Sequence, residues 1–123
     1  MSDRVVVRIP ASTAHVALVR AAASAVAVAL DFTYDRITDL HIALDEVSSR
    51  IMATSARSAC ILEFVLEPDG KGLRVHAGGD APSREGIAFL TDWSRAILGA
   101  VTDEMDVSLN GGRQSASFRV SNR

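Results

Sequence analysis

Apolar residues recur along the chain with two periods, and the changes between them predict the order of the elements. Alternation over residues 5–9, ended by Pro10, predicts a first strand. Spacings of three and four then predict two long helices, from Ser12 or Thr13 to about Leu30 and from about Thr33 to Ser55. The residues expected on their core sides are Val16, Val19, Ala23, Val26 and Leu30 in the first helix and Ile37, Leu40, Leu44, Val47 and Ile51 in the second.

In the second half of the chain, apolar and polar residues again alternate, as is typical of strands. This alternation predicts strands over 59–68 and 72–77, joined as an antiparallel hairpin by the turn residues between Glu67 and Gly72. A third helix is expected from about Thr91 to Thr102, followed by strands over 105–110 and 115–121 with a turn at Asn110–Gly112. The order β-α-α-β-β-α-β-β predicts an α+β fold: a two-layer α/β sandwich whose mostly antiparallel sheet carries helices on one face.

Length and composition narrow the class of protein. The 123 residues are expected to form a single domain over 1–123, and a net charge of −2 argues against direct binding of nucleic acid. The apolar stretch Ala21–Leu30 is half the length of a membrane-spanning helix, and residues 1–10 have no apolar signal core. We therefore expect a cytoplasmic protein without membrane contact, in which the lone Cys60 is a packing residue.

The segment DLHIALDEVSSRI, residues 39–51, resembles the N-box helix of the RsbW-type anti-sigma factors. Those proteins are serine-protein kinases of the superfamily that includes histidine kinases and DNA gyrase. The similarity extends along nearly the whole chain: a strand ending in IPA, a helix with an arginine near its middle, the N-box helix, and two hairpins with a helix between them. The resemblance implies the histidine-kinase-like ATPase fold.

The N box of that family is Glu-x-x-x-Asn, in which the glutamate acts as general base and the asparagine holds magnesium. The resemblance puts Glu46 in the place of the base and Arg50 in that of the metal ligand. A guanidinium has donors only and cannot ligate a cation. The spacing has another interpretation, because an acid four residues before an arginine is also the favoured ion pair on a helix surface.

The other nucleotide motifs are altered as well. The family's aspartate-x-glycine, whose aspartate binds the adenine amino group, corresponds to Ala77 and Gly79, and Asp80 is expected to be a turn residue. The phosphate lid is reduced to Ala81–Leu90, where Gly86 is its remaining glycine. No cofactor is therefore expected, and ATP with magnesium would bind only if other residues compensate.

The first helix is the expected partner surface. Small residues lie opposite its core side: Ala14, Ala17, Ala21 and Ala25. The resemblance implies that this helix, with Arg20 at the matching arginine, contacts the sigma factor, the anti-anti-sigma protein and a sister subunit. The alternative is that the alanines are simply good helix formers and Arg20 a solvated charge.

Other side chains give weaker signals. His15, His41 and His76 lack metal-ligand spacing, so no metal site is expected, and Phe89 and Trp93 are expected to be core or interface anchors. The favoured hypothesis is an anti-sigma factor that sequesters an alternative sigma factor, with degenerate or absent kinase activity. The alternatives are an active serine kinase that phosphorylates an anti-anti-sigma (STAS) protein through Glu46, and a scaffold that binds only such STAS proteins.

Overall fold

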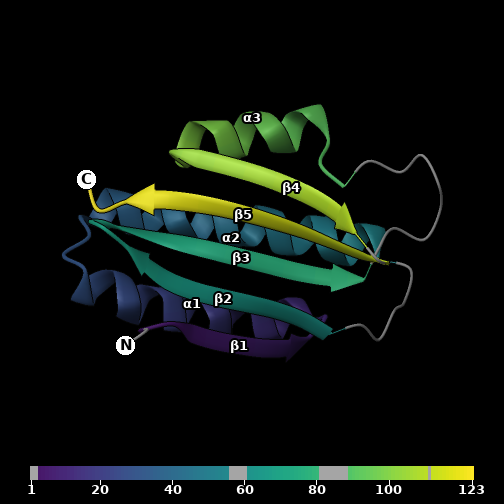
Figure 1. The fold of residues 1–123 in the computed structure, drawn as a ribbon, viewed down its shortest axis with the longest axis horizontal. Helices are drawn as coiled ribbons and strands as arrows, with labels where there is room; N and C mark the ends of the chain where they lie inside the picture. Colours follow the sequence, from purple (N-terminus) through teal and green to yellow (C-terminus); the bar gives the residue numbers. More distant parts are fainter. Residues whose placement is uncertain (1–2, 56–60, 81–88, 111) are drawn as a thin grey trace.

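The computed structural model describes residues 3–55, 61–80, 89–110 and 112–123. These residues form one five-stranded antiparallel sheet with helices packed against it. Its strands are β1 (Val5–Pro10), β2 (Ile61–Asp69), β3 (Gly72–Asp80), β4 (Glu104–Asn110) and β5 (Arg113–Ser121). Their order across the sheet is β1-β2-β3-β5-β4, and every neighbouring pair is antiparallel (Figure 1). The two hairpins that the turn residues predict, β2–β3 and β4–β5, are confirmed. Gly70 and Gly112 in these turns have positive φ, which glycine adopts without strain.

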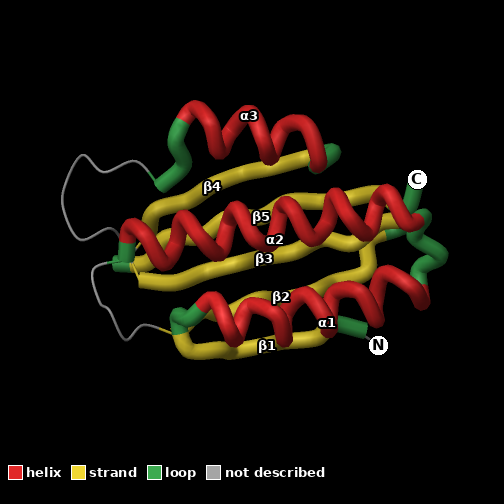
Figure 2. Tube along the Cα trace, turned by 180° about the vertical axis from the view of Figure 1, so that it is seen from behind, coloured by secondary structure: helices red, strands yellow, loops and turns green. Residues whose placement is uncertain are grey.

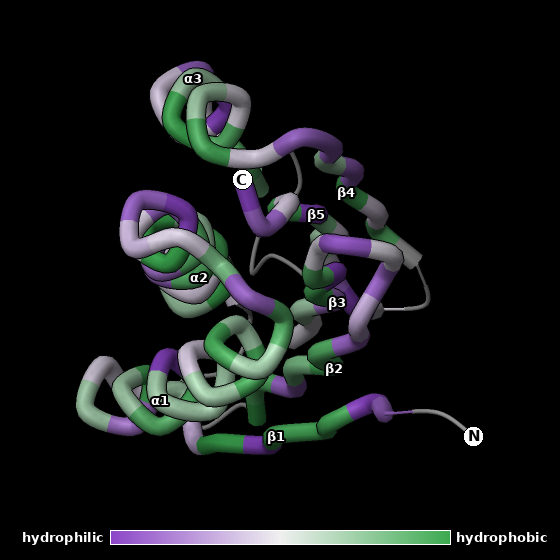
Figure 3. Tube along the Cα trace, turned by 90° about the vertical axis from the view of Figure 1, so that its left-hand side faces the viewer, coloured by the Kyte–Doolittle hydropathy of each residue, from purple (hydrophilic) through white to green (hydrophobic). Residues whose placement is uncertain are grey.

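Three helices in the described part of the chain lie on one face of this sheet: α1 (Thr13–Ala29), α2 (Tyr34–Thr54) and α3 (Asp92–Val101). Seen from behind, the helices lie in front of the sheet (Figure 2), and seen from the side, the helices form one layer and the strands the other (Figure 3). The predicted α+β, two-layer architecture with helices on one face is therefore confirmed. Within the described ranges, no helix combines the length and the apolar character needed to cross a membrane.

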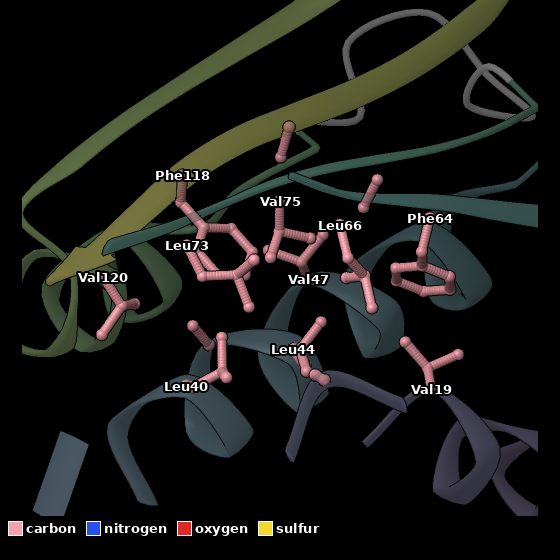
Figure 4. Packing of buried hydrophobic residues seen from close by; sticks show 14 of the residues in the cluster. Val19, Leu40, Leu44, Val47, Phe64, Leu66, Leu73, Val75, Phe118 and Val120 are labelled. Carbon is pink, nitrogen blue, oxygen red and sulfur yellow. The ribbon is translucent and has the colours of Figure 1, made fainter. Parts of the chain in front are cut away.

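The core lies between the two layers (Figure 4). From β2, β3 and β5 it takes the alternate residues that face the helices, such as Phe64, Val75 and Phe118. From α2 it takes Leu40 and Leu44, which with their neighbours form the predicted stripe. Each large side chain buried in this way stabilises the fold by about 1.5–3 kcal/mol relative to leaving it in water.

Two predicted details need correction. In α1 the fourth fully buried residue is Ala27, while Val26 and Leu30 are only partly buried at the edge of the core. Strand β3 continues to Asp80 instead of ending at 77, because its backbone keeps pairing with β5, so Asp80 is a strand residue and not the predicted turn residue. The predicted start of the second strand, at residue 59, lies outside the described residues.

Several salt bridges lie on the outer face of the sheet, beside the exposed apolar side chains Val6 and Ile61. Arg8 and Glu63 are directly opposite each other on β1 and β2 and form an ion pair of 2.6 Å. Arg74 pairs with Asp69 and Glu104, and Arg119 also reaches Asp69. Charges alternate with core residues along these strands, as expected for a sheet with one solvated face.

A hydrogen-bonded cluster ties the start of α2 to the end of β5. Arg36 pairs with Asp103 at 3.0 Å and donates to the backbone oxygen of Ser121, whose N–H donates to Asp103. Burial raises the pKa of Asp103, but the hydrogen bonds from Ser121 and the charges of Arg36 and Arg119 outweigh this effect. The net result is a pKa below the ordinary value of the group, so the carboxylate form stabilises the fold.

Candidate functional site

The N-box residues of α2 make contacts with α3 and the chain leading into it. Glu46 accepts a hydrogen bond of 2.7 Å from the hydroxyl of Ser94, a residue of α3 that is buried. Thr91 caps α3 through the backbone N–H of Ser94, and its hydroxyl is also 3.0 Å from the Ser94 hydroxyl. Glu46 is thus part of a polar contact that positions the first turn of α3 against α2.

Arg50, one turn further along α2, donates from Nε to the backbone oxygen of Phe89 at 2.8 Å. Phe89 is buried, so this bond ties α2 to the segment just before α3. The contacts described for Glu46 and Arg50 therefore have a structural role that neither sequence interpretation included. Neither contact could be found from the sequence, because the residues that meet are 48 and 39 positions apart.

Gly79 has a packing role in β3. A Cβ built on Gly79 would lie 2.4 Å from Cγ2 of Ile51, a distance that real side chains do not tolerate, and 3.1 Å from Cδ2 of Leu62, which is a tight contact. Ile51 belongs to α2, so the helix approaches the sheet closely because Gly79 has no side chain. Ala77, at the position of the adenine-binding aspartate, is 1% exposed and faces the same core.

The expected lid, Ala81–Leu90, lies outside the described residues except for Phe89 and Leu90. Residues 81–88, including Ser83 and Gly86, and the side chain of Asp80 lie outside what the structure describes, as does Cys60. At the end of that segment Phe89 is a core residue, whereas Trp93 is 74% exposed on α3. Of these two aromatic residues, Phe89 is thus the core anchor and Trp93 is available to a partner.

The outer side of α1 is apolar and exposed. Leu18 is 58% exposed and Val28 64%, and the alanines predicted to face outward are exposed as well. We call this the α1 surface; its residues are Ala14, Ala17, Leu18, Ala21, Ala25 and Val28. They recur three and four positions apart, so they form one stripe along the helix. The exposed alanines were predicted from the sequence, whereas Leu18 and Val28 were not, although both have the same spacing.

Arg20 lies at the side of the α1 surface. It is not simply a solvated charge, because Nη1 contacts both carboxylate oxygens of Asp45 on α2, at 3.1 and 3.0 Å. Both side chains remain 40–47% exposed. Exposed pairs of this kind contribute little to stability, typically below about 1 kcal/mol. The pair therefore holds a defined charge arrangement on the surface between α1 and α2.

Among the described residues, the histidines and serines do not assemble into a catalytic group. His41 is 2.6 Å from the Ser24 hydroxyl, which links α2 to α1. On the outer face, register places Ser117 between His76 and Asp106 on adjacent strands. A hydrolytic triad needs the histidine between the serine and the acid, so this row has the wrong order. Among the described residues, no three His, Cys, Asp or Glu side chains gather closely enough to hold a metal ion.

No known family model matches this chain, and a search of curated proteins also gave no match.

Proposed function

We propose that this protein is an anti-sigma factor with the histidine-kinase-like ATPase fold, which binds an alternative sigma factor and keeps it from RNA polymerase. The order of the elements and the two-layer arrangement are compatible with that fold. The resemblance of α2 to the N-box helix suggests the family, and the exposed surface of the helical layer suggests that the protein acts by binding a partner.

The observation that carries the proposal is the α1 surface. Leu18 and Val28 are more than half exposed, and the alanines between them leave the helix backbone open to close approach. Exposed apolar side chains that form a contiguous stripe are typical of protein–protein contacts. Arg20 at its side adds a charge, and arginine is enriched in such interfaces. A sigma-factor segment with an apolar side and an acidic residue would match both features.

Binding is a better account than catalysis because the candidate catalytic residue has a different contact. The Oε2 of Glu46 accepts a hydrogen bond from the hydroxyl of buried Ser94, so one of its two carboxylate oxygens serves the contact between α2 and α3. Ala77 offers no acceptor for an adenine amino group and is buried.

The proposal is tested by measuring binding of the purified protein to each alternative sigma factor encoded in the same genome. The primary sigma factor serves as the control. We expect one alternative sigma factor to bind with submicromolar affinity and its promoter-specific transcription in vitro to stop at stoichiometric protein. If every sigma factor fails to bind while a STAS protein binds, the chain is a scaffold for STAS proteins and the proposal is wrong.

Calorimetric titration with ATP and ADP, with and without magnesium, separates this function from that of a kinase. We expect no heat of binding and no rise in melting temperature, because the adenine acceptor and the metal ligand are missing. Micromolar, magnesium-dependent binding would favour the kinase, whose activity Glu46→Gln would then abolish. Without a kinase step, release of the sigma factor would come from competition by an anti-anti-sigma (STAS) protein for the same helix.

A further inference from the structure

The hydroxyl of Ser48 on α2 is buried without a partner. Ser48 is 1% exposed, and its Oγ has no hydrogen bond to any described residue. The other buried hydroxyls of the described chain are bonded: Thr54 donates to the oxygen of Arg50, and Ser94 to Glu46. A serine within a helix commonly bonds the carbonyl four residues earlier, and Ser48 does not. A buried polar atom left in this way requires an explanation.

Ser48 lies at the wall of a groove between α1 and α2, with a volume of about 180 Å³. We call it the α1–α2 groove; it is lined by Thr13, Val16, Arg20, Asp45, Ser48, Ser49 and Met52. Its walls are thus apolar at Val16 and Met52 and polar elsewhere. Ala17 follows Thr13 by four residues and precedes Arg20 by three, so the groove adjoins the α1 surface. A protein that covers that surface would also cover the groove.

The paired charges in the α1–α2 groove favour the binding of an uncharged group. Arg20 and Asp45 are already paired, so the groove carries one cation, one anion and uncharged hydroxyls. An incoming carboxylate could bind Arg20, and an incoming ammonium or guanidinium could bind Asp45, only by displacing the partner that each already has, whereas a neutral group can bind beside the intact pair. A carboxamide has an acceptor and two donors without charge. Its oxygen can accept from Arg20 or Ser48 while its NH₂ donates to Asp45.

We propose that the α1–α2 groove binds a neutral carboxamide, presented by an Asn or Gln side chain of the partner protein, with Ser48 as its buried contact. This rests on the proposed function only in naming the source of the group as the protein that docks on α1. The chemistry of the groove can be tested without any partner.

The test uses the isolated full chain and three probes of similar size: propionamide, propionate and ethylguanidinium. Each is titrated against the ¹⁵N-labelled protein while amide shifts are followed by NMR. We expect saturable shifts around residues 13–20 and 45–52 with propionamide, at an affinity at least fivefold higher than for the charged probes. Equal responses to all three probes, or no saturable response to propionamide, would overturn the proposal.

Ser48→Ala distinguishes a binding role from a structural one. The variant should weaken propionamide binding at least fivefold while its melting temperature stays equal or rises, because an unpartnered buried hydroxyl is removed. Ser48→Cys, similar in size but a poor hydrogen-bonding group, should do the same and covers the case in which Ser48→Ala does not fold. Ser115→Ala on β5 is the matched control and should change nothing. Unaltered affinity in Ser48→Ala and Ser48→Cys would show that Ser48 is no contact.

The same variants distinguish failure of this inference from failure of the proposed function. If propionamide binds in a Ser48-dependent way but no sigma factor binds, the groove stands and the partner class is wrong. If a sigma factor binds with equal affinity to wild type and Ser48→Ala, and propionamide shows no preference, the function stands and the carboxamide site is wrong.

Discussion

The outer face of the sheet and the α1 surface are both exposed, but they differ in the side chains that they present to water. On the sheet, charged side chains neutralise one another across strands, as Arg8 does with Glu63 and Arg74 with Glu104. On α1, Leu18 and Val28 face water among alanines. Between Thr13 and Ala29, Arg20 is the sole charged residue of the helix, and it pairs with Asp45 of the neighbouring helix.

The difference indicates which face another protein would use. A partner docking on the sheet would have to remove water from several ion pairs, and this desolvation offsets much of the attraction gained. A partner docking on α1 removes water mainly from apolar atoms, which is favourable by about 25 cal/mol per Å². We therefore propose that a partner would bind the helical layer and that the outer face of the sheet stays in contact with water.

The largest expected effect comes from blocking the α1 surface. Ala21→Arg introduces a long charged side chain in the middle of the stripe, where it would hold a partner away. We expect sigma-factor affinity to fall at least about a hundredfold, or about 2.8 kcal/mol. Ser108→Arg, an exposed outer-face position of β4 with the same added charge, is the control and should bind as wild type. If the two variants bind alike, the assignment of the faces is wrong.

The next effect concerns the two faces of β3, because a side chain added at Gly78 and one added at Gly79 would point to opposite faces of the sheet. Gly79→Ala places a methyl group against Ile51 and should lower the free energy of unfolding by about 1–3 kcal/mol. At Gly78 the nearest atom to an added Cβ is the end of the Arg113 side chain at 3.5 Å, so Gly78→Ala should be close to neutral. Chemical denaturation of both variants measures the difference. Equal stabilities would contradict the close approach of α2 to the sheet.

A smaller effect is expected at Asp103, which joins the two layers through Arg36 and Ser121. Its pKa is lowered in the folded protein, so its contribution to stability is present above the unfolded value of about 3.9 and is lost as the pH falls through the folded pKa. Because the side chain is 42% exposed, the contribution should stay below about 1 kcal/mol. Asp103→Asn should therefore melt lower than wild type at pH 7, and the gap should shrink below about pH 4. A gap that is constant between pH 7 and pH 3 would show that the charge is unimportant.

The hydrophobic pattern predicted the order of the elements and most of the core, because burial of a helix or strand face leaves a period in the sequence. It failed where the side chain carries no hydropathy signal. Strand β3 runs on through Gly78 and Gly79, and only the pairing with β5 shows this. The strand order in the sheet also depends on contacts between distant segments, which periodicity does not encode.

The buried polar residues could be predicted from the sequence only in part. Gln114 of β5 is a buried polar residue whose side-chain amide donates to the backbone oxygen of Ile51 on α2; because it alternates with Ala116 and Phe118, its inward direction could have been predicted. Ser48 likewise lies four residues after Leu44, on the core side of α2. The partners of Arg20 and Glu46 could not have been predicted, because they come from other helices. Their identification requires the packing of α1 and α3 on α2.

The most direct test of partner binding at the α1 surface compares two variants with matched charge reversals, Arg20→Glu and Arg8→Glu. The affinity of each variant for the proposed sigma factor is measured. Each breaks one exposed ion pair and changes the net charge equally, one on the helical layer and one on the sheet. We expect at least tenfold weaker binding for Arg20→Glu, wild-type binding for Arg8→Glu, and similar melting temperatures for both. Unchanged affinity in Arg20→Glu, or an equal loss in both variants, would contradict the assignment of partner binding to α1.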